Sequence, residues 1–422
     1  MTRFYLLAGL EGVLLLSIHL LPLHPAVALV CAAIASSAVY LGVAYQITRT
    51  EFSRTALLCI LFLSLLLRAS YLTTTPIGSD DFYRYLWDGK IQSHGINPYR
   101  LAPAAEELQP FHTGSIPANV NHPEMKTVYF PFVQWFFTLA YQMTGDSILG
   151  FKILLLLAEC STMVLLWFLL LRLDLPPKLT LLYALCPLPV FQFALDAHLD
   201  GLGLPLLAAA LLLFARERSA WSLLLLSLSI SVKPVGLVLL PLWFLHEKGV
   251  AARARVLAFP AIVLGLQFLP YAFDANPLEG LTTFTGHWMY NGMAFSIIHS
   301  IVPHNQIART LCALLLAVIL FMVYRGKTPW PDKVYRAILA LLLCSPVVHP
   351  WYVGWMALLI PVARRWSGIV LASTVSLTSI TAARYILTGD WVEEPIILAL
   401  EYLPVVFLVA LEIRKDARRR PG

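Results

Sequence analysis

Two adjacent carboxylates open the most polar segment of the chain. The string IGSDDFYRYLWDGKIQSHGINPYRLAP follows an apolar run, and Ser79 or Asp80 is a suitable N-cap for a helix that begins there. Four polar side chains then fall at i, i+3, i+4 and i+7 and share one helical face, namely Asp81, Arg84, Tyr85 and Asp88. This face offers a general base and a phosphate-binding cation. A solvated helix with an intrahelical ion pair has the same spacing, so the pattern fits both interpretations.

Two further polar positions interrupt apolar runs. Lys233 stands in SVKPVG, where Pro234 breaks the helix, and His349 stands in SPVVHPWYVGW before a similar break. A lysine at this depth is costly unless it meets an anion or water, so Lys233 is a candidate ligand of a phosphate group. A side chain that reaches the lipid headgroups is the simpler alternative.

Two more clusters carry candidate binding residues. The string ALDAHLDG contains Asp196, His198 and Asp200, but positions i, i+2 and i+4 do not share a helical face, so we predict no metal site there. His287 and Asn291 in GHWMYNGMAFS can line a sugar pocket, because amides and aromatic rings suit carbohydrate; anchoring at the membrane interface explains the same residues.

The composition of the whole chain indicates which kind of structure positions these residues. Hydrophobic residues make up 59% of the 422 positions and charged residues 13%, whereas a soluble domain has roughly 25% charged residues. Apolar runs near the ~20 residues that cross a bilayer recur along the chain, and in lipid such runs must be helical. We therefore predict a single all-α integral membrane domain over residues 1–422, with about fourteen spans: 4–22, 26–47, 55–73, 147–172, 179–195, 201–215, 219–232, 234–246, 254–271, 306–324, 334–348, 350–363, 367–385 and 396–413.

The basic residues predict the orientation. With both termini in the cytoplasm, most Lys and Arg fall in inward loops and in a C-terminal cluster at 414–420, as the positive-inside rule requires. The aromatic segment 127–143 is then an interfacial or re-entrant helix rather than a span. Two long loops face outward in this arrangement, a candidate catalytic loop at 74–146 with juxtamembrane helices and a second loop at 272–305.

Several function classes lack their signatures. The formal charge of +6 is explained by the inward loops, so we predict no nucleic-acid partner. The chain contains no GxGxxG motif after a strand, no Walker loop and no HExxH motif, and no cofactor or divalent cation is indicated. A sugar donor used by such a chain must therefore be carried by a lipid. A transporter or flippase of lipid-linked sugars is the alternative, although such proteins usually contain internal repeats and a midplane site.

A family resemblance agrees with these residues. The string DDFYRYLWDGKIQSHGINPY resembles the first-loop signature of the GT-C superfamily of membrane glycosyltransferases, and it is most similar to polyprenyl-phosphate-mannose-dependent mannosyltransferases and glycosyltransferase family 87. The strings YFPFVQW, HLDGLGLPLL, SVKPVGLVLLPL and HPWYVGW resemble later family segments in the expected order. Two departures stand out: the loop follows the third predicted span rather than the first, and Pro131 is offset within the Tyr-Pro-Pro stretch.

The resemblance implies a GT-C-like bundle and an inverting transfer of a hexose, mannose in the nearest relatives, from a polyprenyl-phosphate donor to a lipid or glycan acceptor at the outer face of a bacterial plasma membrane. The essential acidic residue of the family maps to Asp80 or Asp81, and we favour Asp81 because it shares a face with Arg84 and Asp88. The predicted phosphate ligands are Arg84, Lys233 and His349, and the remaining predicted substrate contacts are Tyr85, Asp88, His198, Asp200, His287 and Asn291.

Overall fold

A computed structural model describes residues 1–418 of the chain. Arg419 and Arg420 of the predicted basic cluster lie outside these residues. Helices account for 76% of the structure, and in residues 1–418 no strand forms beyond isolated bridges that join Tyr290 and Asn291 to Val347. The predicted all-α class is therefore confirmed.

The chain divides into two compact units. Unit 1 comprises Met1–Leu67, Leu173–Gln192 and Met289–Gly422, and unit 2 comprises Arg68–Arg172 and Phe193–Trp288. The candidate catalytic loop lies in unit 2, as does the first part of the second predicted loop, up to Trp288.

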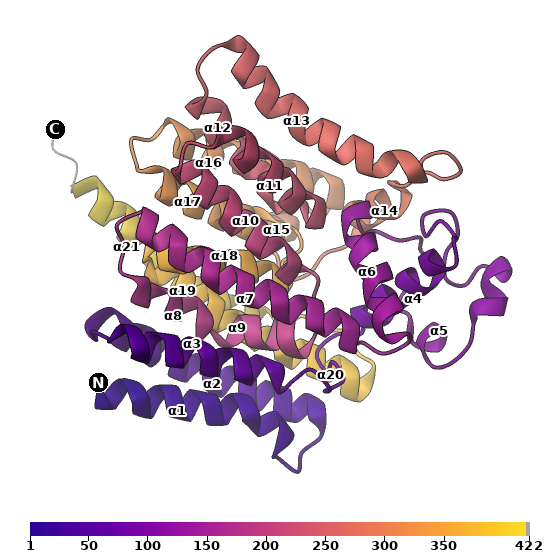
Figure 1. Ribbon diagram of the computed structural model, residues 1–422, viewed down its shortest axis with the longest axis horizontal. Helices are drawn as coiled ribbons and strands as arrows, with labels where there is room; N and C mark the ends of the chain where they lie inside the picture. Colours follow the sequence, from indigo (N-terminus) through magenta and orange to yellow (C-terminus); the bar gives the residue numbers. More distant parts are fainter. Residues whose placement is uncertain (419–422) are drawn as a thin grey trace. The chain divides into compact units, whose positions relative to one another are not determined.

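Unit 2 contains most of the predicted chemistry. Its helices are α4 (Asp81–Ser93), η2 (Glu106–Phe111), α5 (Ile116–Asn119), α6 (Pro131–Thr144), α7 (Leu149–Arg172), α10 (Asp200–Ala215), α11 (Ser219–Val232), η5 (Pro234–Leu239), α12 (Leu240–His246), α13 (Val250–Phe268), η6 (Leu269–Tyr271) and α14 (Glu279–His287). The helix α10 packs against both α7 and α11, and α4 packs against α6. The helices α4 and α6 are drawn in purple in Figure 1.

Unit 1 is also entirely helical. Its helices are α1 (Thr2–Leu16), η1 (Ser17–His19), α2 (Pro25–Arg49), η3 (Pro177–Thr180), α8 (Leu181–Ala184), α9 (Pro187–Pro189), α15 (Met293–Ile301), α16 (Asn305–Arg325), α17 (Trp330–Cys344), α18 (Pro350–Ala363), α19 (Trp366–Thr374), η7 (Val375–Thr378), α20 (Ser379–Thr388) and α21 (Pro395–Arg418). The helix α3 (Arg54–Ala69) and the π-helical turn η4 (Val190–Leu195) connect the two units along the chain.

Local sequence explains where several helices begin and end. Proline occupies the first position of α2, α6 and α18, where its missing N–H leaves no helical bond unmade. The helix α6 ends at Gly145 and α20 ends at Gly389, with φ values of 61° and 78° that favour glycine. Proline also starts α9, where the pair Pro177–Ala184 and Pro187–Leu195 is bent by 49°.

The number of spans is lower than predicted. All fourteen predicted segments coincide with helical structure, but only six helices in residues 1–418 are long and apolar enough to cross a membrane, or seven if the bent pair is one span. The helices α11 and α18 have 14 residues each, which corresponds to about 21 Å at 1.5 Å per residue, less than the ~30 Å of a hydrocarbon core. The bounds of both helices were predicted correctly, but helices of this length do not count as separate spans. The aromatic segment 127–143 forms α6, which has 14 residues and is not among the six.

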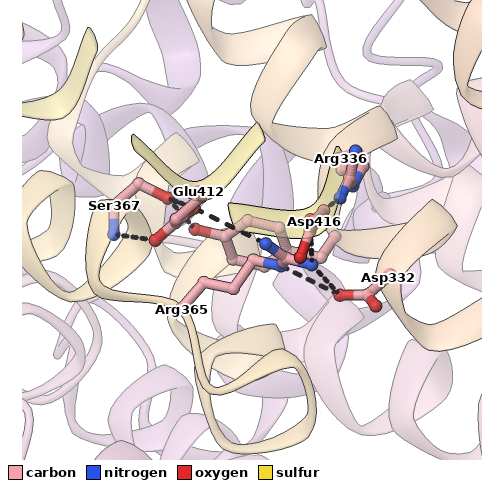
Figure 2. A network of polar contacts seen from close by, with 7 residues as sticks. Asp332, Arg336, Arg365, Ser367, Glu412 and Asp416 are labelled. Carbon is pink, nitrogen blue, oxygen red and sulfur yellow. Dashed lines mark hydrogen bonds and ion pairs between the residues drawn. The ribbon is translucent and has the colours of Figure 1, made fainter. Parts of the chain in front are cut away.

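A polar network ties the C-terminal helix of unit 1 to its neighbours (Figure 2). The Arg365 guanidinium lies 2.9 Å from carboxylate oxygens of Asp332 and Asp416, and Arg336 also pairs with Asp416. The Glu412 carboxylate accepts hydrogen bonds from the backbone N–H and the hydroxyl of Ser367, at 3.0 and 2.7 Å. The helices α17, α19 and α21 are thereby joined at one end.

Candidate functional site

The candidate site lies where α4 begins. Asp80, one of the two predicted N-caps, occupies the cap position of α4 without a side-chain cap hydrogen bond, and Asp81 is the first helical residue. The side-chain amide nitrogen of Asn121 donates to Oδ1 of Asp80 and to Oδ1 of Asp81, each at 2.9 Å. The Ser79 hydroxyl accepts a bond from the Asp81 backbone N–H at 3.2 Å. The two carboxylates are therefore held by a single amide.

Residues from the second half of unit 2 lie beside Asp81. The Nδ1 atom of His198, a fully buried side chain, is 3.8 Å from Oδ2 of Asp81. The Lys233 ammonium donates to the buried Asp200 carboxylate at 3.0 Å. Lys233 is 19% exposed and Asp200 only 1%, so the lysine is the more accessible partner of the pair. Tertiary packing thus brings together a carboxylate, an imidazole and an ammonium group from three sequence segments.

The surroundings of Asp81 tune its acidity. Burial raises the pKa of the Asp81 carboxyl to about 6, and the negative charge of Asp80 acts in the same direction. The hydrogen bond from Asn121 and the positive charge of Lys233 oppose this rise. A carboxyl group with this pKa is ionised at neutral pH and is basic enough to accept a proton from a hydroxyl group during a reaction.

The chain that leads from α3 into this site is anchored by buried charges. The Asp196 carboxylate accepts hydrogen bonds from the backbone N–H groups of Ile77 and Gly78, both at 2.9 Å. The Lys152 ammonium donates to the carbonyl oxygens of Tyr71 and Thr74 at 2.9 and 2.6 Å. Asp196 therefore positions the loop and does not join His198 and Asp200 as a set of metal ligands. In residues 1–418 no group of three or more His, Cys, Asp or Glu side chains is arranged to hold a metal ion.

Arg84, Tyr85 and Asp88 lie inside the loop rather than along its surface. The Arg84 Nε donates to Oδ1 of Asp88 at 3.0 Å, and a terminal nitrogen of Arg84 donates to the Met125 carbonyl at 2.9 Å. Gln134 of α6 donates to the other oxygen of Asp88 at 2.9 Å. All three predicted side chains are buried, and the Tyr85 ring stacks on Phe137 with centroids 4.7 Å apart. These contacts join α4 to the rest of the loop.

The second predicted loop contacts the first within unit 2. Lys126 pairs with Glu279 at 2.8 Å, and the Asn97 amide donates to Tyr271 and Asp274 at 2.9 and 2.6 Å. Gly280 lies so close to this junction that a Cβ atom would be 2.4 Å from the Lys126 carbonyl oxygen. His287 lies at the end of α14 and is exposed, with Nδ1 2.9 Å from the Thr283 carbonyl oxygen. The two predicted loops therefore pack against each other within unit 2.

Two predicted residues belong to unit 1. The side-chain amide of buried Asn291 donates to Glu401 at 3.0 Å, and its backbone N–H donates to Glu393 at 2.7 Å. His349 occupies the cap position of α18, and its ring stacks on Trp351 with centroids 4.3 Å apart.

Comparison with known proteins identifies the family. The MptA/B family model, described as an alpha-(1->6)-mannopyranosyltransferase N-terminal domain, matches residues 11–247, which is more than half of the chain. The chain belongs to this mannosyltransferase family. A search of curated proteins and a search of solved structures found no match.

Membership of the mannosyltransferase family confirms the resemblance to GT-C enzymes that use polyprenyl-phosphate mannose, and it decides for an enzyme over a transporter. The matched segment contains Asp80, Asp81, His198 and Lys233. It also contains Asn121, which the sequence argument missed because its partners lie 40 and 41 positions away. The string NVNHPEM, which contains Asn121, has no periodicity that distinguishes this asparagine from its neighbour Asn119.

Proposed function

We propose that this chain transfers mannose from a polyprenyl-phosphate donor to a hydroxyl group of a lipid or glycan acceptor, with inversion at the anomeric carbon and with Asp81 as the general base. The arrangement of Asp81 beside Asn121, His198 and Lys233 supports this proposal most directly, because it combines a basic carboxylate with a cation in one part of unit 2.

In this reaction Asp81 accepts the proton of the acceptor hydroxyl while the hydroxyl oxygen attacks the anomeric carbon. The bond between that carbon and the phosphate oxygen breaks, and polyprenyl phosphate leaves with the bonding electrons. Because this leaving group is already a stable anion, no general acid is required. A cation that stabilises the charge developing on the phosphate lowers the barrier instead.

We favour Lys233 for this role over Arg84. The Lys233 side chain is partly exposed, and its ammonium group pairs with Asp200 in the same part of unit 2 as Asp81, so its positive charge lies near the proposed base. Arg84 is 4% exposed and bonded to Asp88 and Met125. A phosphate role for Arg84 would require these buried contacts to break. His349 stays a predicted phosphate ligand.

We further propose that both termini lie in the cytoplasm and that the loops 74–146 and 272–305 face outward from a bacterial plasma membrane. The distribution of basic residues supports this orientation. Attachment of an impermeant reagent to single cysteines introduced at Glu107 and at Lys327 tests it. Labelling of intact cells at Glu107 but not at Lys327 is expected, and the opposite pattern refutes the orientation.

Transfer of radiolabelled mannose from polyprenyl-phosphate mannose in purified membranes tests the base. Asp81→Asn is expected to lower the rate about 10²–10⁴-fold while donor binding persists, since base catalysis typically contributes this factor. Glu107→Gln, an exposed carboxylate of the same loop, is the matched control and should retain the wild-type rate. Normal transfer in both Asp80→Asn and Asp81→Asn would refute the assignment.

Donor affinity tests the cation. Lys233→Met is expected to raise the KM for polyprenyl-phosphate mannose about tenfold or more, because one charge-assisted hydrogen bond to phosphate is lost. Lys248→Met, which removes an exposed lysine of unit 2, should leave KM unchanged. An unchanged KM in Lys233→Met would rule out a phosphate-binding lysine.

A further inference from the structure

Asn121 occupies an unusual place between two neighbouring carboxylates. An amide NH₂ group carries two protons, and the Asn121 nitrogen lies 2.9 Å from one oxygen of Asp80 and 2.9 Å from one oxygen of Asp81. Two adjacent negative charges repel each other, so a shared donor both offsets this repulsion and fixes the direction of each carboxylate.

The backbone around Asn121 is held from several sides. Val120 is buried in the hydrophobic core of the loop, and the Pro123 carbonyl accepts a bond from the Ala104 N–H at 2.8 Å. The Met125 carbonyl accepts from Arg84 at 2.9 Å. Asn121 therefore belongs to a segment that is fixed by these contacts, and its amide is held beside the two carboxylates.

The two carboxylates are not equivalent in this arrangement. Asp80 is exposed, whereas Asp81 is 25% exposed at its side chain and turns Oδ2 toward His198. The hydrogen bond from Asn121 engages Oδ1 of Asp81, whereas no hydrogen bond from Asn121 engages Oδ2.

We propose that Asn121 is a positioning residue of the mannosyl transfer, which holds Asp80 and Asp81 side by side and orients Oδ2 of Asp81 to accept the acceptor proton. This inference rests on the proposed role of Asp81 as the base. Asn121 acts through Asp81 and does not itself exchange a proton with the substrate.

The proposal has a consequence for acidity that a purely structural amide would not have. A hydrogen bond donated to a carboxylate favours its ionised form, so loss of the Asn121 amide should raise the pKa of Asp81. The charged and titratable groups that face Asp81 are Asp80, Tyr85, Tyr129, His198, Asp200 and Lys233, and all of them remain in an Asn121 variant.

The test is the pH dependence of kcat for mannosyl transfer in full-length Asn121→Ala, measured beside wild type and Asp81→Asn. We expect the ascending limb of the profile to move upward by about one pH unit, with kcat at pH 6 reduced about tenfold or more and partly recovered at pH 8. The donor KM should not change. Asn121→Asp, which replaces the donor by a third carboxylate, should move the limb further in the same direction.

Asn119→Ala is the matched control, because Asn119 is exposed, comes from the same segment and donates to the Ser115 carbonyl instead. It should keep the wild-type profile. The positioning role is overturned if Asn121→Ala lowers kcat by the same factor at every pH or keeps the wild-type profile. If Asp81→Asn is inactive in the same assay, the assignment of Asp81 as the base still stands. Normal activity in Asp81→Asn instead removes the proposed function itself. Thermal unfolding of each purified variant separates a misfolded protein from a misdirected base.

Discussion

The buried pair of Arg84 and Asp88 separates a structural role from a phosphate-binding role. Its side chains are 5% and 3% exposed, its charged atoms are 3.0 Å apart, and Gln134 donates to the second carboxylate oxygen. Asp88→Leu would leave the Arg84 guanidinium buried without its counter-charge. Removal of one member of a buried ion pair typically costs about 3–5 kcal/mol of unfolding free energy.

The double variant Arg84→Met with Asp88→Leu removes both charges and replaces them by apolar side chains. Its cost should be well below the sum of the single variants, because neither charge remains unpaired. The coupling energy between the two positions is therefore expected to be about 2 kcal/mol or more. The pair Lys126 and Glu279, also in unit 2, is the control: its side chains are 29% and 49% exposed, and its coupling should be about 0–1 kcal/mol.

Denaturant unfolding of the purified protein in detergent measures these energies, and donor KM is measured on the same variants. The structural interpretation requires lost stability in each single variant and recovery in the double variant. An Arg84→Met protein with wild-type stability and a donor KM raised tenfold would refute it, and it would show that the guanidinium binds the donor phosphate.

Three other predictions follow from the geometry. The rate of transfer should rise with pH through an apparent pKa near 6, because Asp81 must be ionised to act as a base. Asp80→Asn should move this rise to lower pH, because it removes a neighbouring negative charge that raises the pKa of Asp81. A pH–rate profile measures both effects. Gly89→Ala should destabilise the loop, although alanine favours helices, because its Cβ would lie 2.3 Å from a carbonyl oxygen of α6. Gly265→Ala in α13, where the added Cβ would meet nothing within 4 Å, should keep or slightly raise the unfolding temperature in the same thermal unfolding assay. Arg365→Gln should lower the unfolding free energy by about 1–2 kcal/mol and speed proteolysis of α21, since the network in Figure 2 loses its central cation.

Local pattern was sufficient for much of the fold. Each apolar run is helical because backbone groups in an apolar environment must bond within the segment, and that requirement depends on the run alone. The start of α4 just after Ser79 and Asp80 also follows from neighbouring residues, although the Asp80 side chain makes no cap hydrogen bond. The family signature around Asp81 was visible for the same reason, since it is a continuous string.

Local pattern did not predict the number of membrane spans or the residues from distant segments that contact Asp81. The bounds of α11 and α18 agree with the predicted segments 219–232 and 350–363, but helices of 14 residues are too short to cross a bilayer as separate spans, so a count of apolar segments overestimates the spans. The face shared by Asp81, Arg84 and Asp88 was correctly placed on a helix, but helical spacing does not say what covers that face. Closure of the loop over about 40 residues brings Asn121 to Asp81, and the same closure buries Arg84 against Met125.

The sequence by itself therefore determined the membrane class, the helices and the carboxylate to which the family signature points. Only the tertiary structure decided which polar groups surround that carboxylate, because contacts between distant segments depend on the packing of the whole unit and leave no periodic trace in the chain.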